Sequence, residues 1–215
     1  MSRLLTRTRL RIVGLGDSTT AGTPGFLSPL EAPPDGSGNL ESQYCYWMMK
    51  AHPEWTVQNR GINGQRTDEI QARFEHDVTE AKPDYVIILA GVNDIYQGVS
   101  LATIKSNLRA LYEKAVSKGI KTVAASVLPY NTASDSEASA IRDLNDWIQE
   151  AAQKLGILFC DTNRAAADPK HQNRLSGSPD GHHPDVAGYK SMGETLAHTI
   201  ATDIQLRNQD PGQRR

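Results

Sequence analysis

Residues 85–90 read Tyr-Val-Ile-Ile-Leu-Ala, a run with the length of a β-strand and without polar residues at alternate positions. A strand with one face in water alternates apolar and polar residues, whereas a strand covered on both faces is apolar throughout. This run therefore predicts a strand of a parallel sheet that has helices on both faces. Residues 10–15, 122–127 and 157–160 share the pattern, and residues 55–58 show it more weakly.

Helical periodicity fills the segments between these runs. Ile70, Phe74 and Val78 recur at intervals of four after Thr67, which we expect to cap the first of these helices. Apolar stripes also cover residues 104–116, 141–155 and 186–200. Strands and helices alternate along the chain, which predicts an α/β fold with a three-layer, doubly wound, parallel five-stranded sheet.

The composition is typical of a globular protein. Its 215 residues fit one domain, which we expect to span residues 1–215. The net charge of −2 excludes the basic surface that nucleic-acid binding requires. We expect a cytoplasmic protein without integral membrane contact, because no run approaches a membrane span and residues 1–11 lack a signal-peptide core. Cys45 and Cys160 cannot form a disulfide framework and are expected to be buried thiols.

Three segments fall outside the alternation of strands and helices. Residues 23–39 are rich in Pro and Gly and follow the first predicted strand. Ligands in such folds bind at the carboxyl ends of the strands, so this insertion either borders the ligand pocket or is an ordinary surface loop. Residues 1–8 and 206–215 are expected to be flexible tails.

A serine stands at the end of the first predicted strand, in the turn Gly14-Leu15-Gly16-Asp17-Ser18-Thr19. A dinucleotide-binding G-x-G-x-x-G loop needs a third glycine where Thr19 stands, so that interpretation is weak. The chain has neither a Walker loop nor the G-x-S-x-G elbow of α/β-hydrolases. Small and hydroxylated residues here suit a tight turn into a helix with free amides. Taken alone, Ser18 fits a turn residue or a helix cap better than a nucleophile.

A nucleophilic serine needs a base, and the base needs an acid that orients it. Residues 180–184, Asp-Gly-His-His-Pro, offer both. Pro184 favours an extended His183 and suits the first position of the last predicted helix, so Asp180 can turn back to the histidine ring. His182 is expected to have a polar surface role.

Two other interpretations of these residue types are weaker. A metal site formed by Asp180, His182, His183 and Asp185 is disfavoured, because adjacent histidines seldom aim at one ion. The spacing Asp-x-x-His recurs in residues 168–171, but that stretch is polar and no apolar helix follows it, so we interpret it as surface.

Two loops that follow predicted strands offer hydrogen-bond donors. Residues 59–64 (Asn-Arg-Gly-Ile-Asn-Gly) and residues 91–94 (Gly-Val-Asn-Asp) are rich in small and amide residues. Cleavage of an ester passes through a tetrahedral oxyanion that needs fixed donors. Gly64, Asn93 and the amide of Ser18 are the candidates, although Asn-Gly pairs are also common in turns. With a serine, a base and an acid, they complete the parts that acyl transfer requires.

In this order, residues 16–18, 59–64, 91–94 and 180–184 resemble the sequence blocks of the SGNH hydrolases, the GDSL esterase/lipase family. The blocks are spread over nearly the whole chain, and their ordered set is far more specific than any one of them. The resemblance implies a flavodoxin-like sheet and the hydrolysis of carboxylic esters through an acyl-serine, without a cofactor. Thr19 replaces a leucine that is frequent in the family, which argues against assuming a lipase.

The resemblance also implies a role for individual residues. Ser18 would be the nucleophile, His183 the base and Asp180 its partner, while Ser18, Gly64 and Asn93 would form the oxyanion hole. His183 is preferred to His182 because the family spacing is Asp-x-x-His. Asp17 and Asp94, which adjoin these residues, are expected to bond loop backbone. Arg66 either meets an anionic part of the substrate or is simply solvated.

The substrate is expected to be a small-molecule ester with a short acyl group, because the chain has few long apolar segments for a tunnel. Lysophospholipids, thioesters, acetylated carbohydrates and aryl esters all fit the family. Tyr44, Tyr46 and Trp47 fit either an acyl pocket or a buried helix face. Two alternatives stay open: a flavin- or phosphate-binding module that uses the hydroxyl-rich residues 18–23, and a non-catalytic interaction domain.

Overall fold

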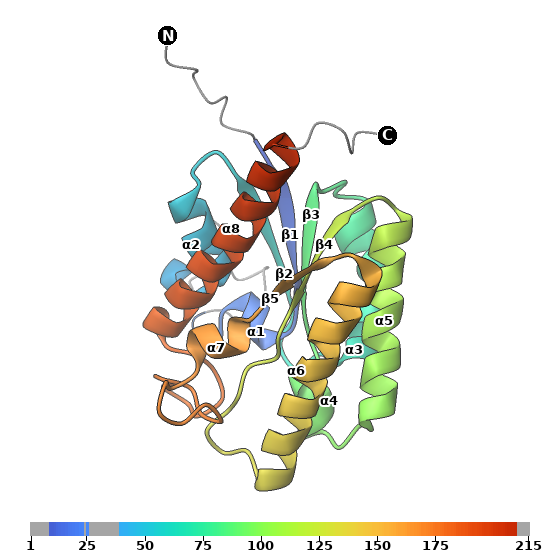
Figure 1. Cartoon of the computed structure of the whole chain (residues 1–215). Coiled ribbons are helices and arrows are strands. Elements are labelled where there is room, and N and C mark those ends of the chain that lie inside the picture. The colour runs from blue at the N-terminus through green and yellow to red at the C-terminus, as the bar shows by residue number, and fades with distance from the viewer. Residues whose placement is uncertain (1–8, 24, 26–38, 210–215) are drawn as a thin grey trace.

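The structure is a computed structural model, which describes residues 9–23, 25 and 39–209. Its centre is a five-stranded sheet with the strand order β2-β1-β3-β4-β5, in which every pair is parallel (Figure 1). The strands are β1 (Arg11–Gly16), β2 (Thr56–Gly61), β3 (Tyr85–Leu89), β4 (Lys121–Ala125) and β5 (Leu158–Cys160). All five predicted strands are present, and the doubly wound parallel fold is confirmed.

Helices cover both faces of this sheet. One face carries α2 (Tyr44–Ala51), α7 (Thr162–Ala166) and α8 (Val186–Gln209), and the other carries α3 (Thr67–Ala72), α5 (Leu101–Ser117) and α6 (Asp135–Leu155) (Figure 1). The described residues also form the short helices α1 (Ser18–Ala21) and α4 (Val92–Tyr96), the 3-10 turn η2 (Leu40–Ser42) and the π-turn η3 (Glu75–Thr79). The sheet is therefore the middle of three layers.

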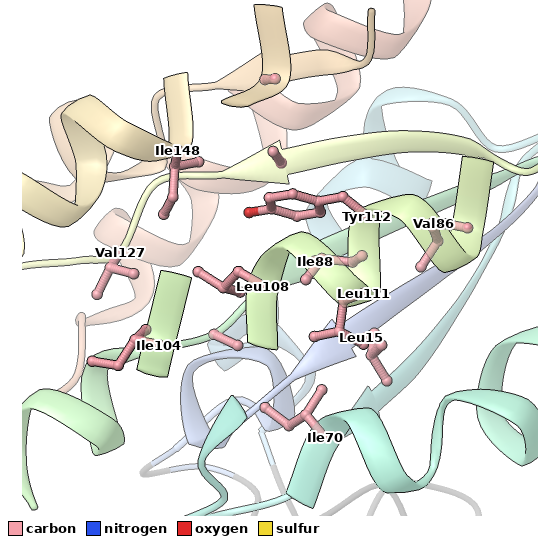
Figure 2. Packing of buried hydrophobic residues seen from close by; sticks show 14 of the residues in the cluster. Leu15, Ile70, Val86, Ile88, Ile104, Leu108, Leu111, Tyr112, Val127 and Ile148 are labelled. Carbon is pink, nitrogen blue, oxygen red and sulfur yellow. The ribbon is translucent and has the colours of Figure 1, made fainter. Parts of the chain in front are cut away.

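The apolar strands feed two separate cores because side chains alternate across a strand. Val86 and Ile88 of β3 pack with Leu108 of α5 on one face, as Figure 2 shows. Ile87, between them, joins the core on the opposite face with Leu196 of α8. Both faces of β3 are thus buried, which explains why its sequence shows no polar alternation.

Most strand ends shift by one or two residues from the predicted runs, and four further differences concern the site and the tail. Strand β2 runs to Gly61, so the first residues of the segment 59–64 belong to the strand. Thr67 is the first residue of α3 and not its cap, and its hydroxyl is held by Asp94 of helix α4. Helix α8 begins at Val186 and not at Pro184, since Asp185 accepts the Gly188 amide and caps the helix.

The fourth difference concerns the tail predicted at 206–215, because residues 206–209 still belong to α8. Residues 210–215, the predicted tail 1–8, and residues 24 and 26–38 of the insertion lie outside the described residues. Within the described part of the chain, no helix is both long enough and apolar enough to cross a membrane. Cys45 and Cys160 are buried as predicted, and burial raises the pKa of the two thiols to about 12 and about 11.

Candidate active site

The predicted site residues meet at the carboxyl edge of the sheet, where β1, β2, β3 and β4 end. A cavity of about 300 Å³ lies there and is lined by residues of all four sequence blocks. Ser18, Gly64, Asn93 and His183 all line it. A parallel sheet directs every strand end to one edge, so loops far apart in sequence converge on this cavity.

Ser18 begins α1, and the turn before it forces the chain to bend sharply. Asp17 caps this helix, because its carboxylate accepts the amide of Thr19 at 2.9 Å. Gly61 of β2 must be a glycine, since a Cβ there would overlap the backbone of Ala21. Ser18 is only 6% exposed and lines the cavity.

Three side chains form one hydrogen-bonded series. Ser18 Oγ lies 2.8 Å from Nε2 of His183, and Nδ1 of His183 lies 2.6 Å from Oδ2 of Asp180. An ionised carboxylate only accepts hydrogen bonds, so the proton of the neutral ring sits on Nδ1. Nε2 is then unprotonated and accepts the Ser18 hydroxyl. This is the arrangement that lets a histidine withdraw a proton from a serine.

The carboxylate of Asp180 stays ionised because its hydrogen bonds outweigh its desolvation. Partial burial by itself raises the pKa of Asp180. The bond to the His183 ring and the amides of His182 and His183 together lower it by more than burial raises it, and the pKa falls to about 2. Both amides donate to Oδ1 at 2.8 Å. Ser178 Oγ in turn donates to the carbonyl of His183 at 2.7 Å, and the amide of Asn131 donates to the carbonyl of Gly181 at 2.7 Å. The loop that carries the histidine is therefore held by its own residues and by the segment after β4.

Three candidate hydrogen-bond donors belong to residues that line the cavity, namely Ser18, Gly64 and Asn93. Within the described residues, the amides of Ser18 and Gly64 have no partner in the protein. The φ of Gly64 is +76°, a conformation that favours glycine. Asn93 donates one hydrogen of its side-chain amide to the carbonyl of Gln65 at 3.0 Å, which leaves its second hydrogen for a ligand.

A buried network ties the Asn93 helix to the loop that follows Gly64. Asp94 accepts the amide of Thr67 at 2.9 Å and its hydroxyl at 2.6 Å. Asn107 of α5 donates to the same hydroxyl at 3.0 Å. Burial raises the pKa of Asp94, and the Thr67 bonds partly offset this. Asp17 and Asp94 therefore both bond backbone amides, as predicted.

Arg66 lies beside the site without lining the cavity. It pairs with Asp68 at 3.2 Å and donates to the side chain of Gln97 at 2.9 Å. Gln97 donates in turn to the carbonyl of Gly64 at 3.5 Å, which is a long and weak bond. Arg66 thus contacts neighbouring loop residues, and the structure gives it no direct position against a ligand.

The cavity has a wall that the sequence motifs do not reveal. Tyr96, Tyr130 and His182 line it, together with Leu128 and Pro129. His182 thus belongs to the cavity rim, although its side chain is exposed as predicted. The only sequence signal for Tyr96 is its spacing, since it lies one helical turn after Asn93. Tyr130 follows the end of β4 and carries no motif.

Other predicted features take ordinary positions. Asp168 is half-buried and His171 is exposed, and the Asp168 carboxylate bonds backbone amides of its own turn. Tyr44 is fully buried on α2, so it belongs to a helix face and not to the cavity wall. Among residues 9–23, 25 and 39–209, no group of three or more His, Cys, Asp or Glu is placed to hold a metal.

The hydroxyl groups after β1 are engaged within the protein. Ser18 meets His183, Thr20 Oγ1 lies 3.2 Å from the Tyr44 hydroxyl, and Thr23 donates to Asn63 at 2.9 Å. A phosphate loop instead turns its hydroxyls and amides towards an open anion site. This feature of the loop favours the serine–histidine interpretation over a flavin or phosphate module.

A doubly wound parallel sheet that holds a serine, a histidine and an aspartate in series at its carboxyl edge defines a class, the serine hydrolases. The model of the GDSL-like lipase/acylhydrolase family matches residues 15–191, and the chain belongs to this family. It is a carboxylic ester hydrolase.

Individual relatives agree with this assignment. An acetylxylan esterase of Geobacillus stearothermophilus is 26% identical over 194 residues, covering 79% of this chain and 87% of the relative. A putative lipolytic protein of the G-D-S-L family from Desulfitobacterium hafniense is 28% identical, with a TM-score of 0.73 over 88% of this chain and 99% of that one. A GDSL-like lipase from Bacteroides thetaiotaomicron, at 24% identity, shares the fold with a TM-score of 0.71 over 90% and 88%.

Proposed function

We propose that this protein hydrolyses carboxylic esters with short acyl groups by way of an acyl-serine, with Ser18 as nucleophile, His183 as base and Asp180 as its orienting acid. The observation that carries the proposal is the unbroken series from Ser18 through His183 to Asp180, with bonds of 2.8 and 2.6 Å. Ser18 Oγ attacks the ester carbonyl while its proton passes to His183 Nε2. The imidazolium that forms faces the Asp180 carboxylate, which stabilises it.

The carbonyl oxygen becomes an oxyanion, for which the amides of Ser18 and Gly64 and the side chain of Asn93 are the proposed donors. Such donors act most strongly when they are fixed before the reaction. The protonated His183 then gives its proton to the departing alcohol as the carbon–oxygen bond breaks. In the second half, water attacks the acyl-serine, its proton passes to Nε2, and the carboxylic acid leaves as Ser18 recovers its proton.

Two observations support a short acyl group. The cavity of about 300 Å³ lies at the small end of the range for ligand pockets, about 300–1,000 Å³. The acetylxylan esterase relative is named for an acetyl substrate, although its 26% identity carries the acyl group to this chain only as a proposal. Rates on p-nitrophenyl acetate, butyrate and octanoate test this point. We expect acetate and butyrate to be hydrolysed fastest, and a preference for octanoate would contradict a short acyl group.

The central test is the variant Ser18→Ala. We expect its turnover of p-nitrophenyl acetate to fall by at least about 10⁴-fold, as in other serine hydrolases without their nucleophile. A fluorophosphonate probe, which attaches to an activated serine, should label the native protein and not the variant. Equal labelling of both proteins, or substantial turnover by the variant, would overturn the assignment of Ser18.

A further inference from the structure

Arg73 is a largely buried cation that the proposed reaction steps do not use. It follows Ala72, the last residue of α3, and its side chain is only 13% exposed. The partner charge is Asp77 of η3, whose carboxylate is 9% exposed and accepts a hydrogen bond from Nη1 of Arg73. A buried ion pair gains little stability over apolar side chains of the same size, so its value to the protein has to lie in what it holds in place.

The guanidinium of Arg73 also bonds two strands and the loop that follows them. Nη2 donates to the carbonyl of Gly16, the last residue of β1, at 2.7 Å, and Nη1 donates to the carbonyl of Arg60 in β2 at 2.8 Å. Nε donates to the side-chain carbonyl of Gln65 at 2.6 Å. Because a guanidinium is a rigid planar fork, these bonds fix three backbone segments relative to one another.

The residues that Arg73 bonds lie next to the groups of the proposed oxyanion hole. Gly16 comes two residues before Ser18, and Gln65 directly follows Gly64. The backbone carbonyl of Gln65 accepts the side-chain amide of Asn93 at 3.0 Å. One side chain thus connects the segments from which all three proposed donors come.

Pairing of the two strands does not depend on the bond from Arg73 to Gly16. Strands β1 and β2 are paired over all six of their residues, and the amide of Ile62 donates to the same Gly16 carbonyl at 3.1 Å. What Arg73 adds is a connection from this strand end to Gln65, and through Gln65 to the side chain of Asn93. The connection therefore serves the orientation of the donors rather than the sheet.

We propose that Arg73 is a positioning residue of the oxyanion hole, which holds the Ser18 amide and the Asn93 side chain at the spacing that the tetrahedral intermediate requires. Arg73 does not line the cavity and takes no part in the transfer of protons. Aligned donors stabilise the transition state more than the bound ester, so their misalignment lowers kcat. Acylation and deacylation both pass through an oxyanion and slow together, which leaves KM nearly unchanged. This inference rests on the proposed function, from which it takes the oxyanion donors.

The main test is Arg73→Lys, which keeps a positive charge beside Asp77 but replaces the planar fork by one ammonium group. We expect kcat on p-nitrophenyl acetate to fall about tenfold or more, with KM within about twofold of the native value. The matched control is Arg207→Lys. Arg207 also pairs with an aspartate four positions away, Asp203, but that carboxylate accepts the hydroxyl of Tyr85 at the amino end of β3. This variant should keep the native kcat and KM.

Inhibition by butylboronic acid separates misaligned donors from partial unfolding. A boronic acid forms a tetrahedral adduct with an activated serine and so imitates the intermediate. Unfolded molecules would lower the maximal rate but would leave the inhibition constant of the folded molecules unchanged. We expect the inhibition constant to rise in Arg73→Lys by about the factor by which kcat/KM falls, and to stay at the native value in Arg207→Lys.

A second variant, Gln65→Ala, removes only the part of the connection that leads to Asn93. We expect kcat to fall about three- to tenfold in the native background and by less than about twofold in the Arg73→Lys background, where the connection is already broken. This variant keeps the buried ion pair of Arg73 and Asp77, so it tests the proposal without disturbing the core.

Three results would overturn the role of Arg73 while leaving the esterase in place. These are a native inhibition constant in Arg73→Lys, a loss seen mainly in KM, and losses in kcat that multiply when Gln65→Ala is added. If butylboronic acid does not inhibit the native protein and the fluorophosphonate probe does not label it, the proposed function fails, and the role of Arg73 fails with it.

Discussion

The two halves of the site are built in opposite ways. The base half consists of Asp180 and His183, and it is local and partly open. The two side chains are 35% and 18% exposed. Their hydrogen bonds stay within residues 178–183, except for the bond to Ser18. The donor half rests on a buried and non-local network, because Asp94 reaches Thr67 across 27 residues and Thr67 reaches Asn107 across 40. The comparison teaches that the proposed proton-transfer groups are held mainly by their own loop, whereas the helix of the proposed oxyanion donor Asn93 is tied to two other helices by buried hydrogen bonds.

The largest effect is expected from the base half. His183→Ala removes the group that accepts the Ser18 proton, so turnover of p-nitrophenyl acetate should fall by about 10⁴-fold or more. Because the His183 side chain is partly exposed and the backbone bonds of its loop remain, the free energy of unfolding should change by less than about 1 kcal/mol. His171→Ala, at the exposed end of the Asp-x-x-His repeat, is the matched control and should remain fully active. Comparable losses in the two variants would contradict the assignment of His183.

The next effect tests the donors. Asn93→Ala removes one hydrogen-bond donor to the oxyanion, and we expect kcat to fall about 10²–10³-fold with a small change in KM. Asn63→Ala removes a second side-chain amide from the cavity, one that accepts a bond from Thr23, and should lower kcat far less. A loss seen mainly in KM would show that Asn93 binds the ground state and is not an oxyanion donor.

A smaller effect on kcat is expected from Asp94, which holds the helix that carries Asn93 in place. Asp94→Ala leaves the amide and hydroxyl of Thr67 without an acceptor in a buried place, which costs about 1–3 kcal/mol of stability. We also expect kcat to fall about tenfold, because the helix that holds Asn93 loses its attachment. In an Asn93→Ala background the effect on kcat should vanish while the loss of stability persists. If the two losses in kcat multiply instead, Asp94 does not act through Asn93.

The smallest effect on turnover belongs to Asp17, the cap that precedes Ser18. Desolvation raises the pKa of Asp17 to about 7, and the neighbouring charge of Asp94 adds to this. The folded protein therefore retains a proton that the unfolded chain loses near pH 4, so this carboxyl lowers stability as the pH rises from about 4 to 7. Asp17→Asn can still accept the Thr19 amide. In urea denaturation it should gain stability relative to the native protein at pH 8 by at least about 1 kcal/mol, with little difference at pH 4. An equal difference at both pH values would contradict the assigned titration.

The contrast between the halves also explains what the sequence could predict. The strands could be predicted because burial of both faces, as in β3, leaves a continuous apolar run in the sequence. Asp180 and His183 could be predicted because they lie only three residues apart. The sequence wrongly predicts Thr67 as the cap of α3, because the partner of the Thr67 hydroxyl is distant in sequence. That partner is Asp94 of α4, which lies 27 residues further along the chain. Tyr96 and Tyr130 were missed for the same reason, since only the folded sheet brings α4 and the end of β4 to one cavity.

The hydrogen bond from Ser18 to His183 joins residues 165 positions apart. A chain made from its N-terminus presents the serine early and its base only after all five strands have been synthesised. Any product cut short before residue 183 therefore carries the proposed nucleophile without its proposed base. In such a fragment the proposed base is missing, so we expect no ester hydrolysis even where part of it has begun to fold. Hydrolysis by this protein thus reports that synthesis has passed the last strand.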